Sequence, residues 1–120
     1  FPKCNFILID SIKKKIKVVN NIIDEIGLQN TIALDLRAEN LNQKFDFIVS
    51  RAVTNMSKFK CYTKGKINKK QNNKLKNGIL YLKGGNLDQE LYNIKHKAYN
   101  ISDFFNESFF DSKKIIHIEI

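Results

Sequence analysis

The sequence predicts an α/β fold: a mostly parallel sheet with helices on its faces and an antiparallel strand at the C-terminal end. Short apolar runs, typical of buried parallel strands, alternate with segments of helical spacing. The last part of the chain instead has two β-prone segments joined by an acidic, aromatic connection, which favours a hairpin. With 42% hydrophobic residues, 28% charged residues and one proline in 120 residues, the composition is globular. We expect residues 1–120 to form a single domain.

The first half of the chain reads as strand, helix, strand, short helix and strand. A continuous apolar run at residues 6–10 ends in Asp10, and a segment with apolar residues every three or four positions follows it. We expect Ser11 to cap the resulting helix, which runs to about residue 26, and Gly27 to end it. The next expected elements are a strand at residues 31–34, about one helical turn at residues 38–41 and a strand at residues 45–50.

The second half begins with a helix and a polar loop. We expect that loop to be too polar to pack against the rest of the chain. The expected elements, in order, are a helix at residues 55–64, the loop at residues 64–77, a strand at residues 79–82, a helix at residues 87–97, and β-prone segments at residues 98–101 and 115–120.

The positive charge is unevenly placed. The net charge is +9, and residues 1–77 hold sixteen Lys or Arg against six Asp or Glu. One explanation is codon bias in an AT-rich genome; the other is a surface that binds a polyanion by releasing its counterions. The loop is then either a phosphate-contacting segment or a disordered insertion. The candidate RNA-binding residues are Lys13, Lys14, Lys15, Lys17, Lys64, Lys66, Lys69, Lys70, Lys74 and Lys76.

One acid stands where a ligand is expected. Asp10 ends the first strand, and open parallel sheets bind ligands at the carboxyl ends of their strands. An acid there either accepts hydrogen bonds from the ribose hydroxyls of a nucleoside cofactor or caps the next helix, and the two roles are compatible. The two histidines and two cysteines form no pair typical of nucleophilic catalysis and no metal-ligand cluster, so we expect neither catalytic side chains nor a metal.

Several short motifs together resemble one family, the bacterial 16S rRNA guanine-N7 methyltransferases, also called glucose-inhibited division protein B. The resemblance runs from residue 1 to about residue 84. The pieces that carry it are Phe1-Pro2, Phe6-Ile7-Leu8-Ile9-Asp10-Ser11 with Lys14, Ile26-Gly27-Leu28-Gln29-Asn30, Arg37-Ala38-Glu39, Phe45-Asp46-Phe47-Ile48-Val49-Ser50-Arg51-Ala52-Val53 and Leu82-Lys83-Gly84.

The resemblance implies a Rossmann-like class I methyltransferase that uses S-adenosyl-L-methionine and has a seven-stranded sheet with the last strand antiparallel. It implies that Asp10 binds the cofactor ribose, that Ala38 and Glu39 border the adenine, and that Arg51 contacts the cofactor or the target base. These four residues should converge at the carboxyl ends of neighbouring strands. Asn40 departs from the family pattern, which often has an acid there.

The family's first strand and its glycine-rich loop are expected before Phe1, so the resemblance implies a fold that is incomplete at its N-terminus. The missing strand would lie between the strands at residues 6–9 and 45–49. We expect those two strands to stand apart rather than to pair directly. A chain with such a slot should aggregate or bind the cofactor poorly.

The expected function is methyl transfer to guanine N7 of 16S rRNA. N7 carries an unprotonated lone pair, so the reaction needs placement rather than a general base. We expect a cytoplasmic protein, monomeric when full-length, that engages neither a membrane nor a metal. The alternative is a non-catalytic, basic RNA-binding module with the same fold. A nicotinamide-dependent dehydrogenase would also place an acid like Asp10 on ribose, but no substrate site follows it in the sequence.

Overall fold

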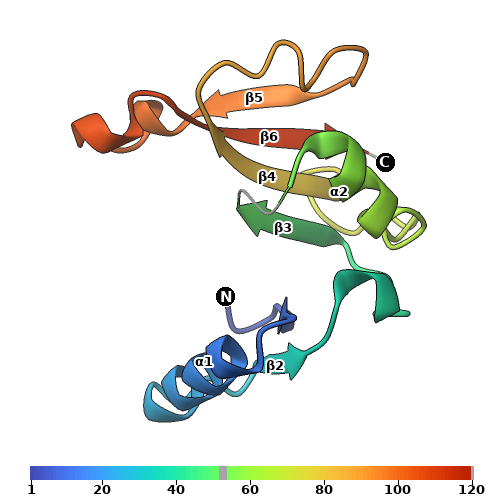
Figure 1. Ribbon diagram of the computed structural model, residues 1–120, viewed down its shortest axis with the longest axis vertical. Helices are drawn as coiled ribbons and strands as arrows, with labels where there is room; N and C mark the ends of the chain where they lie inside the picture. The colour runs from blue at the N-terminus through green and yellow to red at the C-terminus, as the bar shows by residue number, and fades with distance from the viewer. Residues whose placement is uncertain (52–53, 120) are drawn as a thin grey trace. The chain divides into compact units, whose positions relative to one another are not determined.

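The computed structural model describes residues 1–51 and 54–119, which form two compact units, residues 1–42 and residues 43–120. Each unit has its own sheet (Figure 1). The α/β class predicted from the sequence is confirmed, with parallel pairing in both units and antiparallel pairing at the C-terminal end.

The first unit is a strand, a helix, a second strand and a short 3-10 helix. The strands β1 (Phe6–Asp10) and β2 (Thr31–Asp35) are parallel, and the 3-10 helix at Ala38–Asn40 follows β2. Between the strands runs α1 (Lys13–Glu25), which buries Ile16 and Ile23. All these elements lie within two residues of the expected ranges.

Gly27 ends α1 as expected. The Leu28 N–H donates to the Ile23 carbonyl at 3.0 Å and the Gly27 N–H donates to the Asp24 carbonyl at 3.2 Å, which is the Schellman arrangement. It requires a left-handed backbone at the residue after the cap, and Gly27 has φ 67°. This turn directs the chain from the end of α1 back into β2.

The second unit is a four-stranded sheet in the order β3-β4-β6-β5. Its strands are β3 (Phe47–Arg51), β4 (Gly78–Gly84), β5 (Lys97–Asn100) and β6 (Lys113–Glu119). β3 and β4 are parallel, whereas β6 is antiparallel to both of its neighbours, as the predicted hairpin requires. Within their own units, β1 pairs with β2 and β3 pairs with β4.

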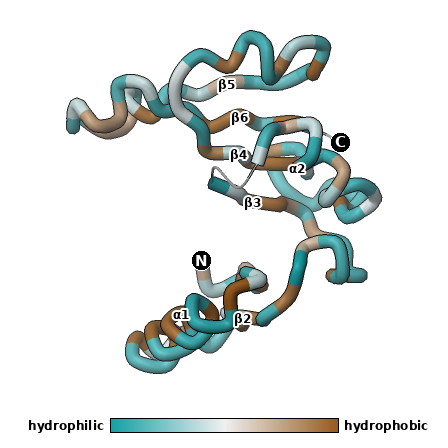
Figure 2. Tube along the Cα trace, viewed as in Figure 1, coloured by the Kyte–Doolittle hydropathy of each residue, from teal (hydrophilic) through white to brown (hydrophobic). Residues whose placement is uncertain are grey.

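The core of the second unit lies between its sheet and α2 (Met56–Thr63). Figure 2 shows hydrophobic residues along β4 and β6. The rings of Phe59 on α2 and Tyr81 on β4 stack with their centroids 5.1 Å apart. Each such fully buried side chain contributes about 1.5–3 kcal/mol. The buried hydrophobic cluster consists of Met56, Phe59, Ile79, Tyr81, Leu87, Leu91, Ile116 and Ile118.

The helix expected at residues 87–97 is wrong. Leu87 and Leu91 have helical spacing and are buried, but the segment forms turns with one helix-like bond, from the Leu91 N–H to the Leu87 carbonyl at 2.9 Å. Asn93 adopts a left-handed φ of 60°, which a helix does not allow. The four-residue spacing of Leu87 and Leu91, which suggested a helix, therefore comes from a turn that buries both leucines.

The loop at residues 64–77 packs, contrary to the expectation that it is too polar to do so. Ile67 is buried and forms a parallel bridge with Phe45. Asn77 and His117 are both 0% exposed, and His117 Nε2 lies 2.9 Å from the Lys76 carbonyl oxygen. Hydrogen bonds within the loop, rather than apolar burial alone, give it a defined conformation.

Candidate functional site

Asp10 is the last residue of β1, and its carboxylate contacts residues at the start of α1. Its Oδ1 accepts a hydrogen bond from the Ile12 N–H at 2.8 Å, and its Oδ2 lies 3.4 Å from Lys15 Nζ. The Ile12 hydrogen bond, helped by Lys15 and opposed by partial desolvation, lowers the pKa of Asp10 below its ordinary 3.8. Asp10 is therefore an anion at neutral pH, and it leads the chain into α1.

The cap predicted at Ser11 is wrong. The residue at the N-cap of α1 is Ile12, and no side chain there accepts a hydrogen bond from the first helical N–H groups. Asp10 already takes the Ile12 N–H, so the chain turns through Ser11 and Ile12 and the helix begins only at Lys13. The expectation that Asp10 caps the helix is also wrong, because its carboxylate accepts from the N–H of Ile12, which precedes the first helical residue.

Three of the four predicted cofactor residues lie at one edge of the first unit. Asp10 pairs in register with Asp35, and the Leu36 N–H donates to the Asp10 carbonyl at 3.2 Å. Ala38 and Glu39 follow within a few residues on the 3-10 helix after β2. The carboxyl ends of parallel strands meet at one edge, which is where open parallel sheets bind ligands.

Asp35 is a site candidate that sequence reasoning missed. It is exposed at the end of β2, beside Asp10 in the register. The signal that could have found it is the repetition of an apolar run ending in aspartate, Ile9-Asp10 and then Leu34-Asp35. An acid at the ends of two adjacent parallel strands marks the same edge of the sheet.

Arg51, the fourth predicted residue, belongs to the second unit. It is exposed and ends β3 at the carboxyl edge of that sheet, in register with Leu82 of β4. The neighbouring Ser50 was not among the predicted site residues. Its Oγ is buried and has no hydrogen-bond partner among the described residues. A buried hydroxyl without a partner is unfavourable.

The backbone at Thr54 and at Met56, where α2 begins, is held by polar contacts from two other segments. The Tyr81 hydroxyl donates to the Thr54 carbonyl. Glu90 Oε1 accepts from the Met56 N–H at 2.7 Å, and Glu90 Oε2 pairs with Lys83 Nζ at 2.8 Å. Asn55 caps α2 by accepting from the Lys58 N–H at 3.0 Å. These contacts fix the start of α2 relative to the end of β4.

The Lys83–Glu90 pair predicts a pH-dependent stability. The hydrogen bond to Glu90 raises the pKa of Lys83 above 10.5, so the pair stabilises the fold fully below that pH and its contribution is lost as the pH rises through the raised value. Glu90→Gln keeps an acceptor for Met56 and should lower the free energy of unfolding at pH 7 by about 1–2 kcal/mol. Urea unfolding at pH 7 and above the raised pKa measures this. Equal losses at both pH values would contradict the ion-pair explanation.

The ten predicted RNA-binding lysines fall into two groups. Those in the first unit occupy the first turns of α1, and all four are exposed. In the loop, five are exposed and Lys66 is half-buried. Lys15 forms an ion pair with Asp10, and Lys76 forms one with Glu119 at 3.5 Å. The loop lysines therefore lie on a segment with a defined conformation. The alternative that the loop is a disordered insertion does not fit this structure.

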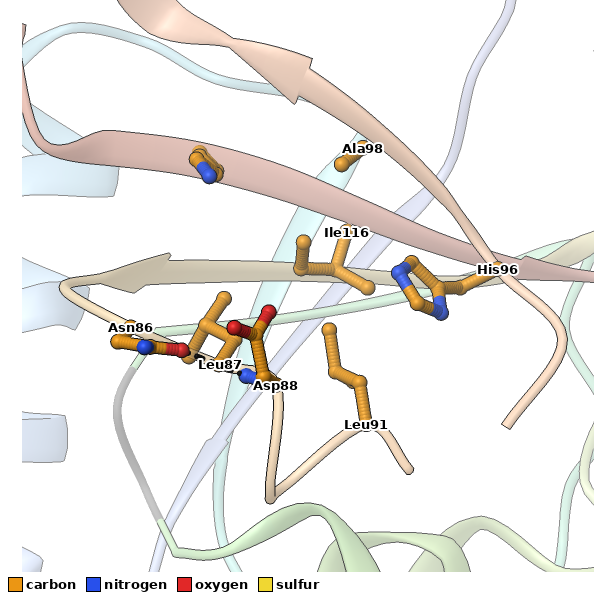
Figure 3. Close-up of a pocket in the computed structure, with 8 residues that line it drawn as sticks. Asn86, Leu87, Asp88, Leu91, His96, Ala98 and Ile116 are labelled. Carbon is orange, nitrogen blue, oxygen red and sulfur yellow. Dashed lines mark hydrogen bonds between the residues drawn. The ribbon is translucent and has the colours of Figure 1, made fainter. Parts of the chain in front are cut away.

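A pocket that the sequence did not predict opens in the second unit, beside the turns that follow β4 (Figure 3). Its volume is about 350 Å³. Figure 3 shows the Asp88 carboxylate and the Leu91 side chain reaching toward Ile116. His96 lies at the rim, with Nδ1 2.7 Å from the Ile94 carbonyl oxygen. Its lining residues are Asn86, Leu87, Asp88, Leu91, His96, Ala98, Lys114 and Ile116.

Within residues 1–51 and 54–119, no three His, Cys, Asp or Glu side chains gather closely enough to hold a metal ion. In the same ranges, no helix has the length and hydropathy needed to cross a membrane.

Comparison with known proteins identifies the family. The model of the family described as rRNA small subunit methyltransferase G matches residues 1–117. The chain is 54% identical over 121 residues to a protein named ribosomal RNA small subunit methyltransferase G from Flavobacterium psychrophilum, covering 100% of the chain and 58% of the relative. A protein of the same name from Flavobacterium johnsoniae is 50% identical over 121 residues, with the same 100% and 58% coverage.

A more distant relative gives the same result. The protein of that name from Cytophaga hutchinsonii is 45% identical over 120 residues, which cover 98% of the chain and 58% of the relative. The chain thus spans less than two thirds of the length of the curated relatives it matches. The match nevertheless extends over nearly all of this chain. The chain belongs to the rRNA small subunit methyltransferase G family.

Proposed function

We propose that the protein is an rRNA methyltransferase of the cytoplasm that uses S-adenosyl-L-methionine to methylate guanine N7 of 16S rRNA. The observation that carries the proposal is the ionised Asp10 at the carboxyl edge of β1, with Ala38 and Glu39 at the same edge. The family names of its relatives support the reaction class. We propose that the full-length protein acts as a monomer.

The residues present fit the cofactor. The Asp10 carboxylate is charged, and its Oδ2 lies 3.4 Å from Lys15 Nζ, a long contact that ribose hydroxyls would replace. Ala38 and Glu39 would border the adenine. Arg51 would contact the cofactor or the target base. When bound, the cofactor supplies a methyl group on a sulfonium.

The role assigned to this chain in the reaction is to position the target base and the cofactor relative to each other. Guanine N7 attacks with an unprotonated lone pair, so holding it in line and close to the methyl group is the main requirement. The purine gains positive charge as the bond forms, and carboxylates or backbone carbonyls near it would stabilise that charge. We therefore assign no general base, and neither His96 nor His117 has a role in the transfer.

The direct experiment is methyl transfer to 16S rRNA from cofactor labelled on the methyl group. The full-length protein should place label in the RNA, and N7-methylguanine should be the labelled nucleoside after digestion. Label at another nucleoside would overturn the N7 assignment, and the absence of label would overturn the proposed activity.

A non-catalytic RNA-binding module is the second candidate. The observation that favours it is that both Asp10 oxygens already have contacts within the chain, with Ile12 and Lys15. Isothermal titration of the full-length protein with S-adenosyl-L-methionine separates the two functions. Saturable binding supports the methyltransferase, and RNA binding without cofactor binding supports the module.

RNA binding by the loop makes a quantitative prediction. Replacing Lys69, Lys70 and Lys74 together by Gln should weaken binding of a 16S rRNA transcript. The log–log dependence of affinity on salt should become shallower by about 2, since each phosphate contact contributes about 0.7–0.9. Filter binding between low and moderate salt measures the slope. An unchanged slope would mean that the loop lysines do not contact phosphate.

A further inference from the structure

Both ends of the lysine-rich loop are tied to the two residues that precede β3. The Phe45 N–H donates to the Lys66 carbonyl at 2.8 Å, and the Asn68 N–H donates to the Phe45 carbonyl at 2.8 Å. At the other end, the Gly78 N–H donates to the Asp46 carbonyl at 3.0 Å. The backbone of Phe45 and Asp46 therefore closes the loop at its base.

The Asp46 side chain holds the interior of the same loop. Its Oδ1 accepts from Asn68 Nδ2 at 2.9 Å and from Asn77 Nδ2 at 3.4 Å. Its Oδ2 accepts from Asn73 Nδ2 at 3.4 Å. One carboxylate thus joins three amides from the beginning, middle and end of the loop.

Asn77 completes this arrangement from a fully buried position. Its Nδ2 donates to the Lys70 carbonyl at 2.8 Å and to the Asn68 carbonyl at 3.1 Å. Its backbone N–H donates to Gln71 Oε1 at 2.7 Å. The loop carbonyls are therefore bonded on the inside, while the side chains of Lys69 and Lys70 are exposed.

The negative charge of Asp46 should by itself weaken RNA binding by the loop. Asp46 is bonded to a loop that carries six lysines, and an acid there lowers the attraction of those lysines for phosphate. By charge alone, removal of Asp46 should therefore tighten binding to RNA. Its hydrogen bonds have the opposite effect, because a loop that is already folded needs less ordering when it binds. The two effects predict changes of opposite sign.

We propose that the loop at residues 64–77 is a preformed binding surface for RNA phosphates and that Asp46 is its positioning residue, acting through Asn68, Asn73 and Asn77. The inference rests on the proposed RNA binding by the loop lysines. Asp46 itself does not contact the RNA: it fixes the backbone from which Lys69, Lys70 and Lys74 project.

The test compares two substitutions that change the charge equally. Asp46→Ala removes all three side-chain bonds, and Asp46→Asn keeps an acceptor for Asn68. Binding of a 16S rRNA transcript should weaken about tenfold in Asp46→Ala, the equivalent of ordering one or two side chains on binding, and less in Asp46→Asn. The matched control is Asp103→Ala, which changes the charge equally at an exposed residue of the second unit and should not weaken binding.

Further measurements keep the inference separate from the proposed function and from simple unfolding. Circular dichroism reports the overall fold, and the side-chain amide NMR signals of Asn68 and Asn73 report the loop. If Asp46→Ala does not fold, Asp46→Asn carries the test, since it preserves size. If the triple Lys→Gln variant weakens RNA binding but both Asp46 variants bind as well as wild type or better, the inference is wrong. If the triple variant binds normally, RNA binding by the loop is wrong.

Discussion

Replacing Gly78 by alanine should strongly destabilise the second unit. A methyl group at Gly78 would overlap the carbonyl oxygen of Ile118, which is backbone of the neighbouring strand β6 and cannot rotate away. Over-packing of this kind costs about 1–3 kcal/mol and sometimes more. Separation of β4 from β6 would also weaken hydrogen bonds worth about 1 kcal/mol each. We expect the free energy of unfolding to fall by about 3 kcal/mol or more, measured by urea unfolding.

Gly84, at the other end of β4, supplies the matched control. A methyl group there would meet the end of the Lys113 side chain, with Nζ at 3.0 Å and Cδ at 3.1 Å. A lysine side chain can move to another rotamer, so Gly84→Ala should change the stability by much less. Equal destabilisation by the two substitutions would show that the loss of glycine in β4, rather than the contact with Ile118, is responsible.

Substitution of Asp10 should have the largest effect on cofactor binding. Asp10→Ala should weaken binding of S-adenosyl-L-methionine by about 100-fold, because hydrogen bonds to a charged group are among the stronger ones. Isothermal titration of the full-length protein measures this. The pKa of Asp10 is lowered, so binding should not vary with its ionisation at neutral pH and should fall only as the pH drops through a value below 3.8.

Two variants separate ribose binding from the role of Asp10 at the start of α1. Asp10→Asn keeps an acceptor for the Ile12 N–H but loses the charge, so helicity should be retained while cofactor affinity falls. Lys15→Gln removes only the 3.4 Å contact and should leave the affinity unchanged or slightly higher. Wild-type affinity in Asp10→Asn would contradict a ribose-binding role.

The strands and the hairpin could be predicted because their signal is local. Apolar runs bounded by polar residues identified β1, β2 and β3, and Gly27 identified the end of α1. The segment at residues 87–97 could not be read in this way, since two buried leucines four residues apart fit a helix and a single turn equally well. Their burial by a turn depends on Asn93 adopting a left-handed backbone, which the apolar pattern does not encode.

The candidate site was predictable in part. Asp10, Ala38, Glu39 and Arg51 were assigned by motif, and the structure adds Asp35 as a candidate by strand register. The fold of the lysine-rich loop could not be predicted, because it depends on hydrogen bonds among Asp46, Asn68 and Asn77, residues that propensity assigns to flexible turns.

The Asn77-Gly78 pair has a consequence for the chemical ageing of the protein. Asparagine followed by glycine is the dipeptide most prone to deamidation, in which the glycine nitrogen attacks the asparagine side-chain carbonyl. Here the Asn77 amide is buried and bonded, and the Gly78 N–H donates to the Asp46 carbonyl at 3.0 Å. The Ile118 carbonyl leaves no room for a larger residue at Gly78, so the Asn-Gly pair cannot be replaced easily at this position. The folded loop should slow its deamidation. The rate at which Asn77 deamidates thus reports how often the loop opens.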